Sequence, residues 1–175
     1  MTGAAHGIGL EVCRALALEG MIVLLTARDL AKATAAAEEL AGEGDVRPLA
    51  LDVVSDESVA AAAAAVSVDP GRLDVLVNNA ARHADWEETA SDADLAVARE
   101  VMDVNLFGPR RTSNALLPLV RQGAPGRIVN VTSGGGSHAD PDFASGPTRG
   151  GRRRTACPRR PQRPHDLLRL GARGV

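Results

Sequence analysis

The sequence has little or none of several features that common classes of protein need. Its two cysteines, Cys13 and Cys157, lie far apart, without the spacing of a metal site or a redox pair. No apolar run approaches the roughly 18 residues of a membrane-spanning helix, and no basic and apolar leader opens the chain. The net charge of -2 gives no general attraction to nucleic acid or anionic lipid. We therefore expect a cytoplasmic protein with no metal site, no membrane span and no nucleic-acid partner.

Two further absences concern acid–base chemistry. The 175 residues include no tyrosine, and Lys32 is the only lysine, so nearly every cationic side chain is an arginine. No tyrosine hydroxyl can therefore donate or accept a proton in this chain. Any role that requires a lysine amine falls to Lys32.

What the sequence does contain is an alternation of helical and strand-like apolar spacing, with Gly, Pro, Asp or Asn at most of the changes. The first helix carries an apolar stripe and ends at Gly20, and Asp29 is placed to cap the second. A long helical stretch over 92–120 is expected to kink near Gly108 and Pro118. Strands are expected at 21–26, 46–51, 73–77 and 126–132, and a further helix at 55–66. The alternation predicts an α/β fold with a parallel sheet. The expected buried faces are Ile8, Val12, Ala15 and Leu16 on the first helix, and Leu30, Ala33, Ala37 and Leu40 on the second.

A glycine cluster opens the chain and leads directly into the first helix: Thr2-Gly3-Ala4-Ala5-His6-Gly7-Ile8-Gly9. Glycines let the backbone turn tightly and approach a pyrophosphate, and the free N–H groups at a helix N-terminus attract its charge. A helix and then an apolar strand follow, as a dinucleotide-binding motif requires. The candidate cofactor residues here are Gly3, His6, Gly7, Ile8 and Gly9, with His6 serving as a loop spacer.

Three more elements follow in order: Asn78-Asn79-Ala80-Ala81, then Val104-Asn105-Leu106-Phe107-Gly108, then Gly126-Arg127-Ile128-Val129-Asn130-Val131-Thr132-Ser133. Together with the glycine cluster they resemble the short-chain dehydrogenase/reductase family over residues 1–146. The resemblance implies a Rossmann-type, doubly wound parallel sheet. It also implies hydride transfer between NAD(P) and a small carbonyl or alcohol substrate.

The resemblance assigns roles around the cofactor. Asp52, followed by Val53, matches the residues that contact the adenine, and its position relative to the other motifs favours this role over that of a turn residue at the end of a strand. Asn78, Asn79 and Ala80 match an element that lies along the cofactor and ties neighbouring strands together. Its fourth position, usually glycine, is Ala81 here.

Arg28 bears on the choice of cofactor. At the end of the second strand of a dinucleotide fold, an acid would bind the ribose 2′-hydroxyl, whereas an arginine would accommodate a 2′-phosphate. The family's acid would be expected at about Ala27, and Arg28 stands where NADP-type members carry a cation. NADP is therefore favoured over NAD, with an ordinary surface arginine as the competing interpretation.

The catalytic positions are only partly present. Asn105 and Ser133 match two of the four that the family uses. An asparagine in mid-helix is either a surface residue or holds a local kink, and a serine in a glycine-rich turn can be incidental. The other two positions are a tyrosine and, four residues on, a lysine that lowers its pKa. The chain has no tyrosine, and its only lysine, Lys32, is expected on the adenine side of the sheet, where it cannot take the place of the family's lysine. The chain is therefore expected to be inactive as written.

Two features suggest an incomplete domain. Only Met1 and Thr2 precede Gly3, so we expect the strand that should lead into the glycine loop to be missing and the resulting sheet to be marginal. The C-terminal strands of the fold are expected to be missing as well. A non-catalytic dinucleotide-binding pseudoenzyme or a truncated fragment is the alternative function. Family members form dimers or tetramers, and that assembly is in doubt here.

Residues 147–175 differ from the rest, with nine arginines, one acid and four prolines. A disordered tail is favoured over a basic binding arm, since no aromatic residues are interleaved for base stacking. A shifted reading frame is the third interpretation. Read one base earlier, the codons for Thr155 to Pro161 can encode the family's Tyr-x-x-Ser-Lys-Ala element, with the tyrosine level with Thr155 and the lysine level with Arg159.

Overall fold

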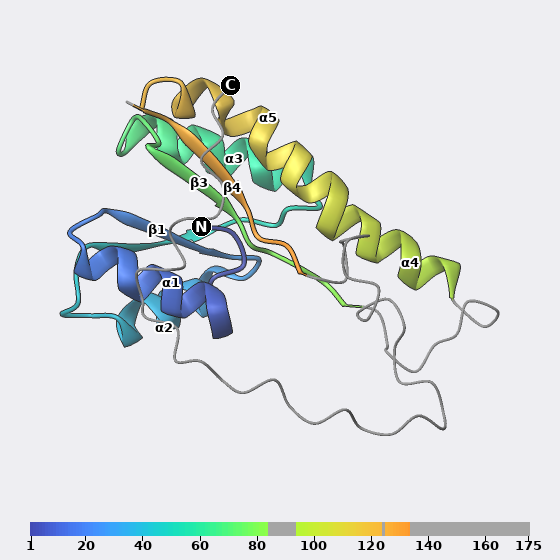
Figure 1. Cartoon of the computed structure of the whole chain (residues 1–175), viewed down its shortest axis with the longest axis horizontal. Helices are drawn as coiled ribbons and strands as arrows, with labels where there is room; N and C mark the ends of the chain where they lie inside the picture. The colour runs from blue at the N-terminus through green and yellow to red at the C-terminus, as the bar shows by residue number, and fades with distance from the viewer. Residues whose placement is uncertain (84–93, 124, 134–175) are drawn as a thin grey trace, which may run out of the picture. The chain divides into compact units, whose positions relative to one another are not determined.

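The computed structural model describes residues 1–83, 94–123 and 125–133. The chain divides into two units, Met1–Val131 and Thr132–Val175, and the helices and strands of the described residues lie in the first. Figure 1 shows these elements. In chain order they are α1 (Gly7–Leu18), β1 (Val23–Ala27), α2 (Leu30–Glu39), β2 (Val46–Ala50), α3 (Asp56–Val68), β3 (Val75–Asn78), α4 (Leu95–Met102), the π-helical turn η1 (Asp103–Phe107), α5 (Gly108–Val120) and β4 (Arg127–Asn130).

The four strands form two parallel pairs. β1 pairs with β2, in a register that joins Val23 to Val46, and β3 pairs with β4, in a register that joins Val75 to Arg127. Consecutive strands that run parallel need a crossover, and the intervening helices supply it. The predicted α/β class with a parallel sheet is confirmed.

Residues 1–4 lie between the two strand pairs and bond to both. On one side Thr26 N donates to Met1 O at 3.2 Å and Ala4 N donates to Thr26 O at 2.9 Å. On the other side Thr2 N donates to Val77 O at 2.9 Å. The order across the fold is therefore β2, β1, residues 1–4, β3, β4, which is the order of a doubly wound sheet. Met1 and Thr2 therefore lie between β1 and β3 at the start of the glycine loop.

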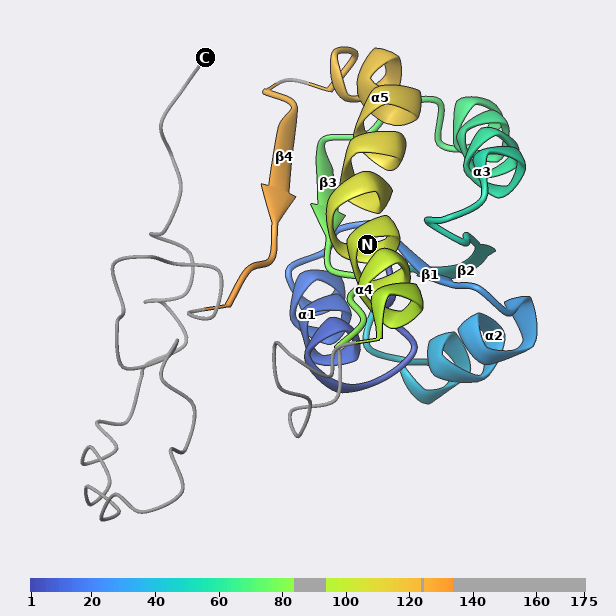
Figure 2. The same ribbon diagram turned by 90° about the vertical axis from the view of Figure 1, so that its right-hand side faces the viewer.

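Helices cover both faces of the strands (Figure 2). Neighbouring residues of a strand point to opposite faces, and β1 illustrates this. Leu25 packs in a cluster with residues of α1 and α2. Leu24 packs against a cluster on the other face, which α3, β3 and α5 build. Unit 1 is therefore a three-layer arrangement of helices, strands and helices.

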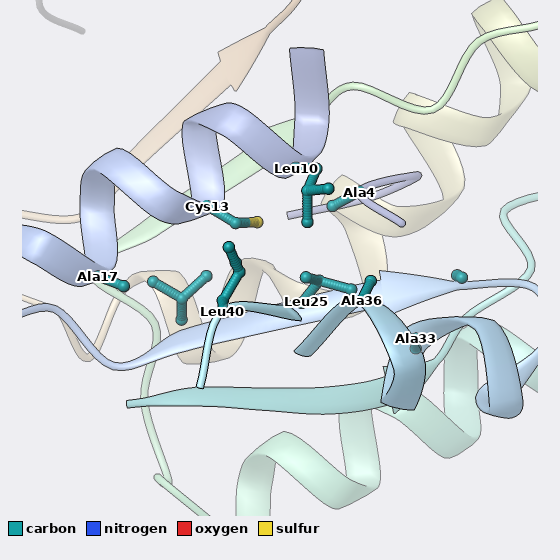
Figure 3. Close-up of a cluster of buried hydrophobic side chains, with 10 residues drawn as sticks. Ala4, Leu10, Cys13, Ala17, Leu25, Ala33, Ala36 and Leu40 are labelled. Carbon is teal, nitrogen blue, oxygen red and sulfur yellow. The ribbon is translucent and has the colours of Figure 1, made fainter. Parts of the chain in front are cut away.

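Figure 3 shows the first of these clusters, in which Leu10 and Cys13 of α1 meet Leu25 of β1 and Leu40, which follows α2. The buried face of α1 is Gly9, Leu10, Cys13 and Ala17. The expected stripe of Ile8, Val12, Ala15 and Leu16 was wrong for Ile8, which is 73% exposed, and for Ala15, which is also exposed, whereas Leu16 is partly buried against the cluster.

The physical reason is that α1 is apolar on nearly every side, so its pattern does not select one face. Arg14 lies on the side of α1 that faces α2, where its guanidinium bonds to Glu39, the last residue of α2, and to Glu43. On α2 the expected face was correct for Ala33, Ala37 and Leu40. It was wrong for Leu30, which is half exposed.

Predicted helix caps are found where the sequence placed them. The Asp29 carboxylate accepts a hydrogen bond from Ala31 N at 2.8 Å, at the start of α2. The Ser55 hydroxyl accepts one from Ser58 N at 3.1 Å, at the start of α3. Each side chain satisfies an N–H group that the first turn of a helix leaves without a partner.

Candidate functional site

The candidate site lies at the carboxyl ends of β1, β2 and β3, where Arg28, Asp52 and Asn79 follow the strands directly or after one residue. The strands are parallel, so these ends share one edge of the fold. Residues 1–4 lead into the rest of the glycine loop at the same edge. In a doubly wound sheet the crevice at this edge, where the strand order reverses, is where ligands bind. The reversal here falls at residues 1–4, between β1 and β3.

Thr2 and Asn79 hold the glycine loop in place. The Thr2 hydroxyl accepts hydrogen bonds from Asn79 N at 2.9 Å and Ala80 N at 3.0 Å, and Thr2 is only 2% exposed. The Asn79 side-chain amide donates to Thr2 O at 3.0 Å and Gly3 O at 2.9 Å. The sequence analysis named Asn79 and Ala80 but not Thr2. Its place at the head of the Thr-Gly motif was the available signal.

The glycines of the loop serve two different purposes. A Cβ on Gly3 would lie 2.7 Å from Ala80 Cα, and a Cβ on Gly9 would lie 2.7 Å from the Asn79 side-chain amide nitrogen. These two glycines therefore permit close packing within the chain. Gly7 has a φ of +59°, which favours glycine, and a Cβ there would meet nothing within 4 Å. Gly7 thus faces open space.

The first turn of α1 is free to bind an anion. His6 occupies the N-cap position, and its side chain makes no capping hydrogen bond. The N–H groups at this end carry the positive end of the helix dipole and have no partner within the helix. His6, Gly7 and Ile8 are all exposed. An uncapped helix terminus behind a glycine that opens onto free space fits the pyrophosphate of a dinucleotide.

Arg28 and Asp52 flank the ends of β1 and β2. Arg28 is exposed, and within the described residues its guanidinium has no hydrogen bond or ion pair. Ala27, where an acid was considered, is a buried strand residue. Asp52 accepts a hydrogen bond from Val54 N at 3.2 Å, so it does act as a turn residue. Val53 beside it is buried.

Asn78 is buried and bonded entirely within the protein. Its side-chain amide nitrogen donates to Ser113 Oγ at 3.1 Å and to Asn130 Oδ1 at 2.9 Å, and its oxygen accepts from Thr112 Oγ1 at 2.8 Å. These bonds join β3 to α5 and β4. The carboxamide of Asn78 therefore supports the edge of the sheet, while the residues after it form the loop.

Asn105 lies in the π-helical turn η1, between α4 and α5. Its side chain makes two hydrogen bonds to the backbone of Arg82. The amide nitrogen donates to Arg82 O at 2.7 Å, and the amide oxygen accepts from Arg82 N at 2.8 Å. The sequence left two interpretations of Asn105, a surface residue or a residue that holds a local kink. The π-helical turn is a local departure from α-helical geometry of the second kind. The break falls at Asp103–Phe107, and α5 then begins at Gly108 and continues past Pro118 to Val120.

Arg111 is a site residue that the sequence analysis missed. Its guanidinium donates to Val53 O at 2.6 Å, to Asp103 Oδ1 at 3.3 Å and to Asp56 Oδ1. Partial burial lowers the pKa of Arg111, but the hydrogen bonds and charges of Asp56 and Asp103 outweigh this, so the pKa is raised. The partners are 8 to 58 residues away in sequence, and no local pattern indicates them.

Ser133 belongs to the second unit, three residues after the end of β4, and it is exposed. The predicted boundary at residue 146, the arginine-rich segment 147–175 and the reading-frame hypothesis at Thr155–Pro161 all lie outside the described residues. They remain predictions.

Within the described ranges, no group of three or more His, Cys, Asp or Glu side chains could hold a metal ion. No helix in these ranges is long and apolar enough to cross a membrane.

Comparison with known proteins decides the family. Residues 1–145 match the short chain dehydrogenase family model. The chain belongs to the short-chain dehydrogenase family. This confirms the resemblance seen in the motifs, and the Rossmann-type fold agrees with that of solved family members.

Relatives of this short-chain dehydrogenase include a (+)-neomenthol dehydrogenase of Arabidopsis thaliana, 34% identical over 76% of this chain and 52% of the relative. A galactitol 2-dehydrogenase (L-tagatose-forming) of Cereibacter sphaeroides is 43% identical over 83% of this chain and 56% of that protein. A metagenomic short-chain oxidoreductase solved in complex with NADP is 34% identical, with a TM-score of 0.68 over 75% of this chain and 60% of that one. The chain thus spans about half the length of the curated relatives it matches.

Proposed function

We propose that this short-chain dehydrogenase binds NADP(H) at the carboxyl edge of its strands, as part of an oxidoreductase for a small carbonyl or alcohol substrate. The observation that carries the proposal is the first turn of α1, which is uncapped and faces open space at Gly7, with the exposed Arg28, unpaired among the described residues, at the end of β1. The related oxidoreductase solved with NADP supports it. NAD is the less favoured cofactor.

Each part of the site has a role in this proposal. The N–H groups of the glycine loop and α1 bind the pyrophosphate, Arg28 binds the 2′-phosphate, and Asp52 with Val53 contacts the adenine. Asn105 fixes the chain at Arg82, and the Ser133 hydroxyl orients the substrate oxygen. A bound nicotinamide cofactor supplies or accepts the hydride. Two relatives, named as a (+)-neomenthol dehydrogenase and a galactitol 2-dehydrogenase, support the proposed substrate class.

Proton transfer is the step for which this chain lacks a residue. The family resemblance assigns it to a tyrosine with a lysine, and the chain contains no tyrosine. Lys32 lies exposed on α2, beyond the end of β1. We therefore propose that the chain as written binds the nucleotide without turning substrate over. A non-catalytic binding module or a fragment is the second candidate, and retention of Asn105 and Ser133 favours descent from an enzyme.

The cellular compartment of the protein, the cytoplasm, is a further part of the proposal. Cys13 is a buried free thiol, and burial raises its pKa, an effect that the nearby Met1 ammonium reduces. A thiol kept neutral and unpaired is compatible with the reducing cytoplasm. A homodimer or tetramer of the family kind stays a prediction for this chain.

The experiment that tests cofactor choice is calorimetric titration of the chain with NADP⁺ and NAD⁺, alone and with Arg28→Met. We expect tighter binding of NADP⁺, and a loss of about 10- to 100-fold in its affinity on substitution, because a charge-assisted hydrogen bond contributes about 1.5–3 kcal/mol. NAD⁺ affinity should barely change. Arg121→Met is the matched control, since Arg121 is also exposed but caps the far end of α5. Equal affinity for both nucleotides, unaffected by Arg28→Met, would contradict the proposal.

A further inference from the structure

Arg111 contacts two parts of the site that the strands do not join. From α5 its guanidinium reaches Val53 O in the loop after β2, and Asp103 at the first position of η1. A third bond goes to Asp56 in the first turn of α3. The side chain is 22% exposed, whereas the Asp56 side chain is 88% exposed. The Asp103 side chain is 43% exposed, so the bonds to Val53 O and to Asp103 are less exposed than the bond to Asp56.

The two parts also pack directly against each other. Gly108, the first residue of α5, lies so close to the loop that a Cβ there would be 2.9 Å from Val53 Cγ2. The loop after β2 thus rests on the junction of η1 and α5. A guanidinium that bonds to both sides of such a close contact fixes their relative position, because its planar fork presents donors in fixed directions.

From η1 the contacts continue to the glycine loop. Asn105 in η1 holds the backbone of Arg82 through two hydrogen bonds. Three residues earlier, Asn79 and the residue after it bond to Thr2 and Gly3. One series of contacts therefore runs from the loop after β2, through Arg111 and η1, to the loop before α1.

We propose that Arg111 is a positioning residue that couples the loop at Val53 to the turn that carries Asn105. It therefore couples the two ends of the nucleotide site. The second statement rests on the proposed function, whereas the first concerns the protein alone. Arg111 itself contacts no reacting atom in this proposal. It acts through the position of η1 and of the Arg82 backbone.

Arg47 provides the matched control. Its guanidinium also bonds to two carboxylates, those of Asp45 at 2.6 Å and Asp69 at 2.8 Å, and it is 36% exposed. These bonds lie around β2 and the end of α3, and no described contact links them to η1. A general loss of surface ion pairing would affect Arg47→Met and Arg111→Met alike. A positioning role would not.

The experiment measures amide hydrogen exchange, residue by residue, in the full chain without nucleotide. The probe is the amide of Arg82, an exposed residue whose N–H is held by Asn105 Oδ1. We expect Arg111→Met to speed its exchange by about 2- to 30-fold, the range that coupled positions produce. Arg47→Met should leave it unchanged. Should Arg111→Met fail to fold, Asp103→Asn removes the negative charge that Arg111 contacts in η1 and should speed the exchange of the Arg82 amide in the same direction by a smaller factor.

An unchanged Arg82 amide in Arg111→Met, or in Asp103→Asn where the former does not fold, would overturn the coupling, as would an equal change in Arg47→Met. Binding of NADP⁺ then tests the second statement. The effects of Arg111→Met and Asn105→Ala on affinity should be smaller together than their sum, and additive effects would overturn it. If the Arg82 amide responds but the unmodified chain binds no nucleotide, the coupling stands and the proposed function fails.

Discussion

Thr2 shows how much of the site depends on single hydroxyl groups. Thr2 is buried beside β3, and its hydroxyl oxygen accepts hydrogen bonds from two backbone N–H groups in the loop after β3. A buried donor that loses its partner costs about 1–3 kcal/mol, which exceeds the net value of an ordinary hydrogen bond. The hydroxyl of Thr2 is therefore as important to the loop as any glycine in it.

Thr2→Val should lower the free energy of unfolding by roughly 2–4 kcal/mol, because the valine has the same shape and leaves both N–H groups without an acceptor. Urea denaturation followed by circular dichroism measures this. Thr26→Val is the matched control, since Thr26 is equally buried but its hydroxyl only donates, to Met1 O at 3.1 Å. Met1 O also accepts from Thr26 N, so we expect a loss below about 1 kcal/mol there. Similar losses in both variants would contradict this account.

Among the elements, α1 combines two functions at its opposite ends. Gly7 begins the helix and Gly20 follows its end, both with positive φ and both with open space where a Cβ would project. An L-residue in the left-handed region costs roughly 1–2 kcal/mol wherever it is placed. The two glycines are therefore equivalent in backbone strain. They differ in that only Gly7 adjoins the uncapped first turn.

Gly7→Ala and Gly20→Ala should therefore lower stability by similar amounts, roughly 1–2 kcal/mol each, and differ in nucleotide binding. The added methyl group at position 7 projects into the space proposed for the pyrophosphate. We expect Gly7→Ala to abolish measurable binding of NADP⁺ in calorimetry, and Gly20→Ala to retain the unmodified affinity. Retained binding in Gly7→Ala would place the pyrophosphate elsewhere.

How far the sequence predicts the structure differs from one element to the next. The glycine loop and the caps at Asp29 and Ser55 were predictable, because each depends on residues within a few positions of each other. The buried face of α1 was not, since the helix is apolar nearly all round and contacts with α2 select the side. Arg111 was missed for a related reason. Its partner Val53 is 58 residues away in sequence, and nothing in the local pattern of α5 marks it.

At the scale of the whole molecule, the described residues contain the loops that we propose bind the nucleotide. The loops that would hold the nucleotide follow β1, β2 and β3 or precede α1, and all of them lie in unit 1. Of the two catalytic matches, Asn105 lies in unit 1 and Ser133 lies in unit 2. Binding and turnover should therefore be separable in this chain.

The last prediction is that the chain as written binds NADPH but does not oxidise it. Hydride transfer to a carbonyl needs a proton donor near the new hydroxyl, and acid–base catalysis typically contributes about 10²–10⁴-fold in rate. The chain offers no tyrosine, and its one lysine lies exposed on α2. The assay follows NADPH absorbance with a panel of aldehydes and ketones, beside protein expressed from the shifted reading frame over Thr155 to Pro161. That protein should regain turnover if the DNA reads TAC across the Arg154 and Thr155 codons and AAG across the Pro158 and Arg159 codons. Turnover above background by the chain as written would show that a different residue supplies the proton.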